Sequence, residues 1–178
     1  QIIKEDNKIA KDNYNVKASG AQILTSPFST IAEYYAPFKS ALERKSVDVL
    51  EEIKTSGIRG RGGAGFPMGT KLEFCRKEKN DTKFIICNAD EGDPGAYSDR
   101  YLLEEQPHSV LFGMLMAGYV THASYGVLYI RAEYPEAIKI IQEAVDAIRS
   151  EGLIGKNILG SEFSFDFKVI SAQGSYIC

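Results

Sequence analysis

The sequence predicts an α/β fold with a largely parallel sheet, and two observations support this prediction. Three short segments, at residues 83–87, 125–131 and 163–171, have the apolar content or the alternation typical of β-strands. Segments with helical periodicity, at residues 107–123 and 137–148, separate these strands. Strands that alternate with helices of this length are typical of parallel β-α-β units, so we expect helices packed on a sheet.

The first 45 residues have weak hydrophobic periodicity and contain the breakers Gly20, Pro27 and Pro37. We therefore predict an irregular lead-in at residues 1–45 and an α/β domain at residues 46–178. Residues 1–15 are mostly polar and contain no apolar region of the kind found in a signal peptide.

The helices of the predicted domain follow from capping residues and spacing. Ser46 is a suitable N-cap, and apolar residues then recur at helical spacing until Gly57. A second helix is predicted at residues 70–79, after a glycine-rich stretch. Pro107 is expected to begin a long apolar helix that ends near residue 123, and the periodic segment 137–148 ends at Gly152.

The composition excludes several classes of protein. With 178 residues, 44% hydrophobic and 25% charged, the chain is long enough and apolar enough for a folded core. A net charge of −3 gives no basic surface for nucleic acid. The longest apolar run, residues 110–120, is much shorter than the roughly 20 residues that cross a bilayer. We therefore expect no nucleic-acid binding and no membrane insertion.

The cysteines and histidines of this sequence do not have the number or spacing of metal ligands or catalytic residues. Cys75, Cys87 and Cys178 are too few and too scattered for a disulfide framework or a metal site, which favours a reducing compartment. His108 and His122 are isolated in a helical stretch, where a structural role is the usual one. No metal ligands are predicted.

The segment 57–69 has six glycines in thirteen residues, a density that only a loop accommodates. Its backbone N–H groups, the N-terminus of the following helix and the charge of Lys71 together are suited to binding a phosphate. Gly60, Gly62 and Gly65 match the dinucleotide fingerprint GxGxxG, but a helix and not a strand precedes them. No Gly-Lys-Ser/Thr closes a P-loop, and a purely structural turn is the remaining alternative.

Polar residues of segment 88–95 directly follow the first predicted strand. They include Asn88, Asp90, Glu91 and Asp93, whose oxygens accept hydrogen bonds from imides and hydroxyls. Because α/β proteins bind ligands at the carboxyl ends of strands, this segment is expected to line a ligand site. A calcium loop and a solvated acidic turn are the alternatives, and the spacing of the acids does not match an EF-hand.

Both motifs, GRGGAGFPMGTK and NADEGDPGAYSDR, are followed in order by GMLMAGY, GLIGKNILG and GSYIC. From about Leu50 to Cys178 the chain resembles the FMN- and NADH-binding flavoprotein subunit of respiratory NADH dehydrogenase, and of NAD-linked hydrogenases and formate dehydrogenases. The EGDPGA segment is more similar to the sequences of the hydrogenase and formate dehydrogenase branch than to those of the respiratory branch. The resemblance implies a Rossmann-like FMN-binding domain, incomplete at the C-terminus.

The resemblance also implies roles for individual residues. Gly60, Arg61, Gly62, Gly63 and Lys71 would hold the FMN phosphate and ribityl chain, and Asn88, Asp90 and Glu91 would bind the flavin. Phe66 and Phe74 would flank the adenine of NADH, although core packing is usual for phenylalanine. Asp93 stands where some members carry Glu and would bind the ribose, and Tyr176 would lie beside the flavin.

The resemblance further implies hydride transfer from NADH to FMN and onward electron transfer to iron-sulfur centres outside this chain, with the flavin carrying the chemistry. It implies other subunits of a redox complex, located in the cytoplasm or peripherally on the cytoplasmic or matrix side of a membrane. It places the family's iron-sulfur cluster beyond Cys178, so this fragment alone is expected to be inactive. The alternatives are a non-catalytic nucleotide-binding or scaffold fragment and the flavin subunit of a sodium-pumping complex.

Overall fold

The computed structural model describes residues 29–174. Their helices and strands follow the order α2 (Ile31–Tyr34), α3 (Ala36–Leu42), α4 (Ser46–Thr55), α5 (Met68–Lys77), β1 (Phe84–Ala89), α6 (Ser98–Glu105), α7 (Pro107–Thr121), β2 (Tyr125–Arg131), α8 (Pro135–Ser150), a 3₁₀ turn (Ile158–Gly160) and β3 (Asp166–Ala172).

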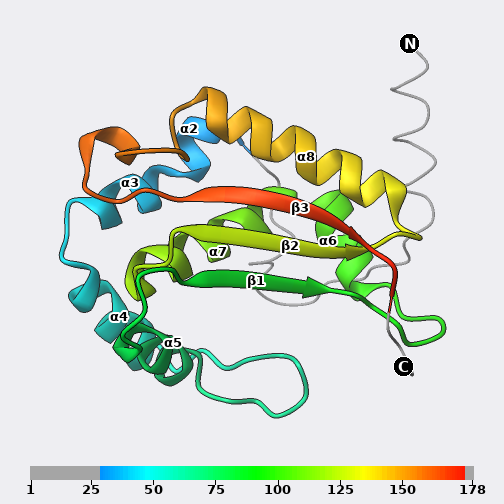
Figure 1. The fold of residues 1–178 in the computed structure, drawn as a ribbon, viewed down its shortest axis with the longest axis horizontal. Helices are drawn as coiled ribbons and strands as arrows, with labels where there is room; N and C mark the ends of the chain where they lie inside the picture. The colour runs from blue at the N-terminus through cyan, green and yellow to red at the C-terminus, as the bar shows by residue number, and fades with distance from the viewer. Residues whose placement is uncertain (1–28, 175–178) are drawn as a thin grey trace.

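The sheet of the described residues is parallel, with strand order β1-β2-β3. Phe84 pairs with Tyr125, and Tyr125 pairs with Asp166, so the three strands begin at the same level. Helices α6 and α7 connect β1 to β2, and α8 connects β2 to β3 (Figure 1). The predicted α/β class with a parallel sheet is confirmed, and all three strands have their carboxyl ends at one edge.

The helices cover one face of the sheet. Leu128 and Ile130 of β2 are fully buried in one core with Leu115 of α7 and Ile141 of α8. On the opposite face Phe84 is 52% exposed, and Ile86, Tyr125 and Tyr129 are also exposed. Parallel sheets are normally covered on both faces. The described residues therefore leave an apolar, partly aromatic sheet face open.

Helix α7 is apolar on all sides because it lies at the centre of the fold. It contacts helices α3, α4, α5, α6 and α8 as well as strands β1 and β2. Gly118 of α7 also allows close packing against Phe165, which precedes β3: a Cβ at this position would lie 2.4 Å from a ring carbon of that buried side chain. The helix ends at His122, which adopts the left-handed conformation with φ of 59°.

The described part of the predicted lead-in is more regular than the sequence indicates. Helices α2 and α3 occupy residues 31–42, and Tyr35 and Phe38 are fully buried in the core. Pro37 does not break this segment because it lies in the first turn of α3, where the missing N–H costs nothing. The helical content of residues 31–42 therefore corrects the expected irregular structure, while the division into lead-in and domain stays a prediction.

Other element boundaries differ by small shifts. Helix α5 begins at Met68 instead of residue 70, and β1 runs from Phe84 to Ala89 instead of residues 83–87. Strand β3 begins at Asp166, three residues later than expected. The short helix α6 was not predicted at all. The shift of β1 is important for the site, because it places Asn88 within the strand.

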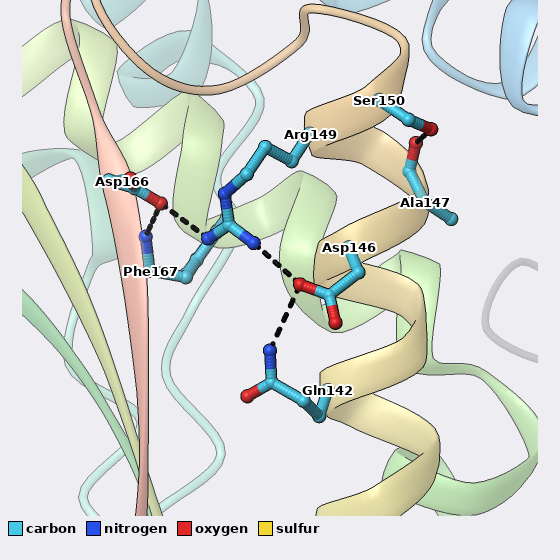
Figure 2. Close-up of polar contacts among 7 residues, drawn as sticks. All are labelled: Gln142, Asp146, Ala147, Arg149, Ser150, Asp166 and Phe167. Atoms are coloured by element: carbon cyan, nitrogen blue, oxygen red, sulfur yellow. Dashed lines mark hydrogen bonds and ion pairs between the residues drawn. The ribbon is translucent and has the colours of Figure 1, made fainter.

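At the amino end of β3, ionic contacts join helix α8 to the sheet (Figure 2). The guanidinium of Arg149 donates to Asp166 at 2.8 Å and to Asp146 at 2.6 Å. Asp166 also accepts from the backbone N–H of Phe167, and Gln142 donates to Asp146. All these groups are partly exposed, so this contact stabilises the fold by at most about 1 kcal/mol.

Candidate functional site

A pocket of about 550 Å³ lies at the carboxyl end of β1, between the two loops that the sequence singles out. This volume is typical of a small-molecule or cofactor site. Its lining residues are Arg61, Gly62, Asn88, Asp90, Glu91, Gly92, Asp93, Ala96, Ser98 and Asp99. The structure therefore brings Arg61 and Gly62 of the glycine-rich loop together with Asn88, Asp90, Glu91 and Asp93.

The glycine-rich loop, residues 56–67, has a closed base and an open tip. At the base, the N–H of Gly60 donates to the carbonyl of Phe66 at 2.8 Å, and the N–H of Met68 donates to that of Ile58 at 2.9 Å. The side chain of Arg59 spans the loop and donates to the carbonyl of Gly65 at 2.9 Å. These bonds close the base of the loop.

The glycines of the tip are not required by contacts within the fold. A Cβ at Gly62, Gly63 or Gly65 would meet no atom within 4 Å. Gly63 and Gly65 have φ of 104° and 59°, which explains glycine at these two positions by conformation alone. Gly62 has neither constraint, and an accessible backbone at this position fits a ligand that approaches the loop closely.

The acidic loop begins at the end of β1. The side chain of Asn88 accepts from the N–H of Asp90 at 3.1 Å, which turns the chain away from the sheet. A second turn follows, with the N–H of Ala96 donating to the carbonyl of Asp93 at 3.1 Å and Gly95 at φ of 81°. Asp93 is exposed and Asp90 half-buried, and both line the pocket.

Glu91 differs from its neighbours because its carboxylate is engaged by the protein. It accepts from the hydroxyl of Ser98 and from the N–H of Asp99 at 3.0 Å, and from the hydroxyl of Tyr134 at 3.1 Å. Partial burial alone would raise the pKa of Glu91, but these hydrogen bonds outweigh it and lower the pKa below its ordinary value. Glu91 therefore lies ionised at the N-terminus of α6.

The charged side chains of the pocket determine where a phosphate and where the hydrogen-bond donors of a ligand fit. Its acidic side contains Asp90, Glu91, Asp93 and Asp99, whereas Arg61 is the cation that lines it. Burial and the neighbouring Glu91 raise the pKa of Asp99. A phosphate would be repelled by this side, so it fits only at the glycine-rich loop. Hydroxyl and imide groups, which donate hydrogen bonds, fit at the acidic loop.

The other predicted residues within the described chain do not line the pocket. Phe66 and Phe74 are 46% and 55% exposed, with ring centroids 6.4 Å apart, so neither packs in the core. Lys71 is exposed in the first turn of α5. Gly60 and Gly63 belong to the base and the tip of the glycine-rich loop. Tyr176 and Cys178 lie outside the described residues.

Sequence reasoning missed four residues that shape the site. Ser98 and Asp99 line the pocket at the start of α6, and their residue types at a helix start were the available signal. Arg131 and Tyr134 contact Glu91 from 40 and 43 residues away. No local pattern in the sequence indicates those contacts.

A larger cavity of about 610 Å³ lies at the opposite end of the sheet and contains none of the predicted site residues. His122 lines it and is hydrogen-bonded to the hydroxyl of Ser46 at 2.9 Å. His108 is 3.1 Å from the hydroxyl of Tyr35. Both histidines thus have structural partners, as expected, and this cavity lies away from the two loop motifs.

Neither thiol chemistry nor a metal is indicated by the described residues. Burial and the charge of Asp99 raise the pKa of Cys87 to about 11, so its thiol is protonated at neutral pH. Residues 29–174 contain no group of three or more His, Cys, Asp or Glu side chains arranged to hold a metal ion. In the same range no helix has the length and apolarity needed to cross a membrane.

Comparison with known proteins shows the family to which this chain belongs. Residues 53–178 match the family model described as the Nuo51 FMN-binding domain. The NADP-reducing hydrogenase subunit HndC of Solidesulfovibrio fructosivorans is 46% identical over 144 residues, which cover 81% of this chain and 29% of that protein. An NADH-quinone oxidoreductase subunit of Aquifex aeolicus is 38% identical over 144 residues, which cover 81% of this chain and 34% of that protein.

A solved structure is also similar to this chain. The crystal structure of an NAD⁺-reducing [NiFe]-hydrogenase in the H₂-reduced state superposes with a TM-score of 0.73 at 30% identity. It covers the whole of this chain, which corresponds to 32% of the matched chain. This chain thus spans about a third of the length of these relatives. It belongs to the Nuo51 FMN-binding domain family.

Proposed function

We propose that this chain is the FMN-binding part of a flavoprotein subunit that oxidises NADH and passes the electrons to iron-sulfur centres. One observation carries the proposal: the pocket at the end of β1 is formed by the glycine-rich and acidic loops together. Membership of the FMN-binding family and relatives that act on NADH, NAD⁺ or NADP support it.

The residues of the pocket fit the separate parts of FMN. The backbone of Gly62 and Gly63, with the charges of Arg61 and Lys71, would hold the phosphate. Gly60 is proposed beside them, although its N–H already donates to the carbonyl of Phe66. The oxygens of Asn88 and Asp90 would accept hydrogen bonds from the flavin and its ribityl chain. Glu91 is also proposed to bind the flavin, although Ser98 and Asp99 already donate hydrogen bonds to its carboxylate.

For NADH, the exposed rings of Phe66 and Phe74 offer an aromatic surface to the adenine, and Asp93 offers a carboxylate to a ribose hydroxyl. Tyr176, from the matched segment, is proposed beside the flavin. When bound, FMN supplies the hydride acceptor. The protein's residues bind and orient the two cofactors, and none of them is required as a nucleophile or metal ligand.

The relatives are subunits of multi-subunit redox enzymes, so we also propose that this chain functions within such a complex, in the cytoplasm or peripherally on a membrane. The test is expression of the complete gene, followed by a visible spectrum and NADH-to-ferricyanide turnover. A flavin absorption band together with turnover supports the proposal. A protein that binds nucleotide but lacks both signals would be the scaffold alternative and would refute it.

A further inference from the structure

Among the described residues, hydrogen bonds attach the acidic loop, residues 91–96, to the rest of the fold at Glu91. Within the described chain, residues 91–96 form hydrogen bonds with other segments only through Glu91, whereas the bond between Ala96 and Asp93 is internal to the loop. Three of the partners of Glu91, residues 98–100, begin helix α6 directly after the loop. The other two, Arg131 and Tyr134, come from the connection between β2 and α8.

Arg131 and Tyr134 flank the next β-α connection. Arg131 is the last residue of β2, and Tyr134 immediately precedes α8. A guanidinium N–H of Arg131 donates to the carbonyl oxygen of Glu91, and the hydroxyl of Tyr134 donates to its carboxylate at 3.1 Å. Both the backbone and the side chain of Glu91 are thus held by the neighbouring connection.

These two side chains are themselves fixed in place. The guanidinium of Arg131 is bound by Glu133 at 2.9 Å and lies over the ring of Tyr134, 5.5 Å from its centroid. A second guanidinium, that of Arg100, lies 5.6 Å from the same centroid. Cation–π contacts of this kind restrict the ring. The Tyr134 hydroxyl is therefore presented to Glu91 with little freedom.

We propose that Arg131 and Tyr134 are positioning residues of the cofactor site. They hold Glu91, and through it the acidic loop, in the conformation that lines the pocket. The inference rests on the proposed function for its ligand, FMN, but the attachment of the loop is a property of the protein alone. Neither residue lines the pocket, so both act through Glu91.

The test uses Tyr134→Phe, which keeps the ring and removes the hydroxyl, and Arg131→Met, which keeps the length of the side chain and removes the donors. Arg131→Lys restores a donor. The matched control is Arg149→Met, because Arg149 also joins a helix to a strand but at the amino end of β3 (Figure 2). All variants are made in the protein expressed from the complete gene.

The first measurement is amide hydrogen exchange of the loop in the FMN-free protein. Exchange at the amides of Ala96, Asp99 and Arg100, which donate to Asp93 and Glu91, is expected to rise severalfold in Tyr134→Phe and Arg131→Met, less in Arg131→Lys, and not in Arg149→Met. Unchanged exchange in both test variants would overturn the positioning role. This readout does not depend on a ligand, so it decides the loop attachment even if the proposed function fails.

The second measurement is FMN affinity by fluorescence titration of the apoprotein. Loss of one hydrogen bond predicts about twofold to tenfold weaker binding in each test variant, with wild-type affinity in Arg149→Met. In a double-mutant cycle, Tyr134→Phe should add little to Glu91→Ala, because Glu91→Ala already removes the acceptor of the Tyr134 hydroxyl. Additive losses would show that Tyr134 acts independently of Glu91 and overturn the inference. A wild-type protein that binds no FMN would instead refute the proposed function.

Discussion

Replacement of Gly69 by alanine tests the packing that supports the glycine-rich loop. Gly69 is buried in the first turn of α5. Helix α5 packs against α4, and the glycine-rich loop connects these two helices. An added Cβ would lie 2.4 Å from the Cγ, 2.7 Å from the Cα and 2.9 Å from the backbone nitrogen of Lys54. Because two of these atoms are backbone, the clash is relieved only if the helices separate.

The expected cost follows from this geometry. Overpacking of a closely packed contact destabilises a protein by about 1–3 kcal/mol. Removing a glycine from a helix returns less than about 1 kcal/mol, and Gly69 has no left-handed φ that alanine would strain. A net loss of about 1–2 kcal/mol lowers the Tm of a chain of this size by about 2–8 °C.

The assay is thermal unfolding followed by circular dichroism, with Gly113→Ala as the control. Gly113 also lies within a helix, α7, but a Cβ there meets no atom within 4 Å. The control is therefore expected to keep or raise the Tm, since alanine is the better helix former. A Tm for Gly69→Ala equal to or above that of the wild type would refute the close contact between α4 and α5.

Three further predictions concern cofactor choice, pH and the isolated chain. Asp93→Asn should lower the NADH-to-NADPH ratio of kcat/KM, because a carboxylate near the ribose repels a 2′-phosphate; an unchanged ratio would assign the discrimination to another residue. Burial lowers the pKa of His108, so its contribution to stability is present above the ordinary value of 6.5 and is lost as the pH falls below it. The Tm of His108→Gln should accordingly fall less between pH 7 and pH 5.5 than that of the wild type, and equal falls would contradict this. The 178-residue chain expressed alone should bind FMN weakly, oxidise little NADH and bind the dye ANS at its exposed sheet face, whereas tight stoichiometric FMN binding would show that the two loops suffice.

The parts of the site that follow from local chemistry could be predicted from the sequence. The glycine density of segment 57–69 predicts a loop, and the structure has a loop at residues 56–67 between α4 and α5, with Gly69 in the first turn of α5. The acids that follow β1 were expected at the carboxyl edge of a parallel sheet, and they line the pocket at that edge. Family resemblance supplied the identity of the cofactor, which neither loop specifies by itself.

The parts that the sequence did not reveal depend on contacts between distant segments. Glu91 was expected to bind only a ligand, but its partners Arg131 and Tyr134 lie 40 and 43 residues away and carry no motif. Helices α2 and α3 have four and seven residues, too few for a repeating apolar stripe. The burial of α3 depends on packing against α7, which periodicity alone does not indicate.

The most direct test of the account is FMN binding by the Gly62→Val and Lys71→Ala variants of the complete protein. Gly62 has open space around it and no left-handed φ, so valine should leave the Tm nearly unchanged. We predict that this variant nevertheless loses FMN because its side chain occupies the approach of the phosphate, and that Lys71→Ala loses FMN through the missing charge. Flavin retained at one equivalent in both variants would contradict the placement of FMN at the glycine-rich loop.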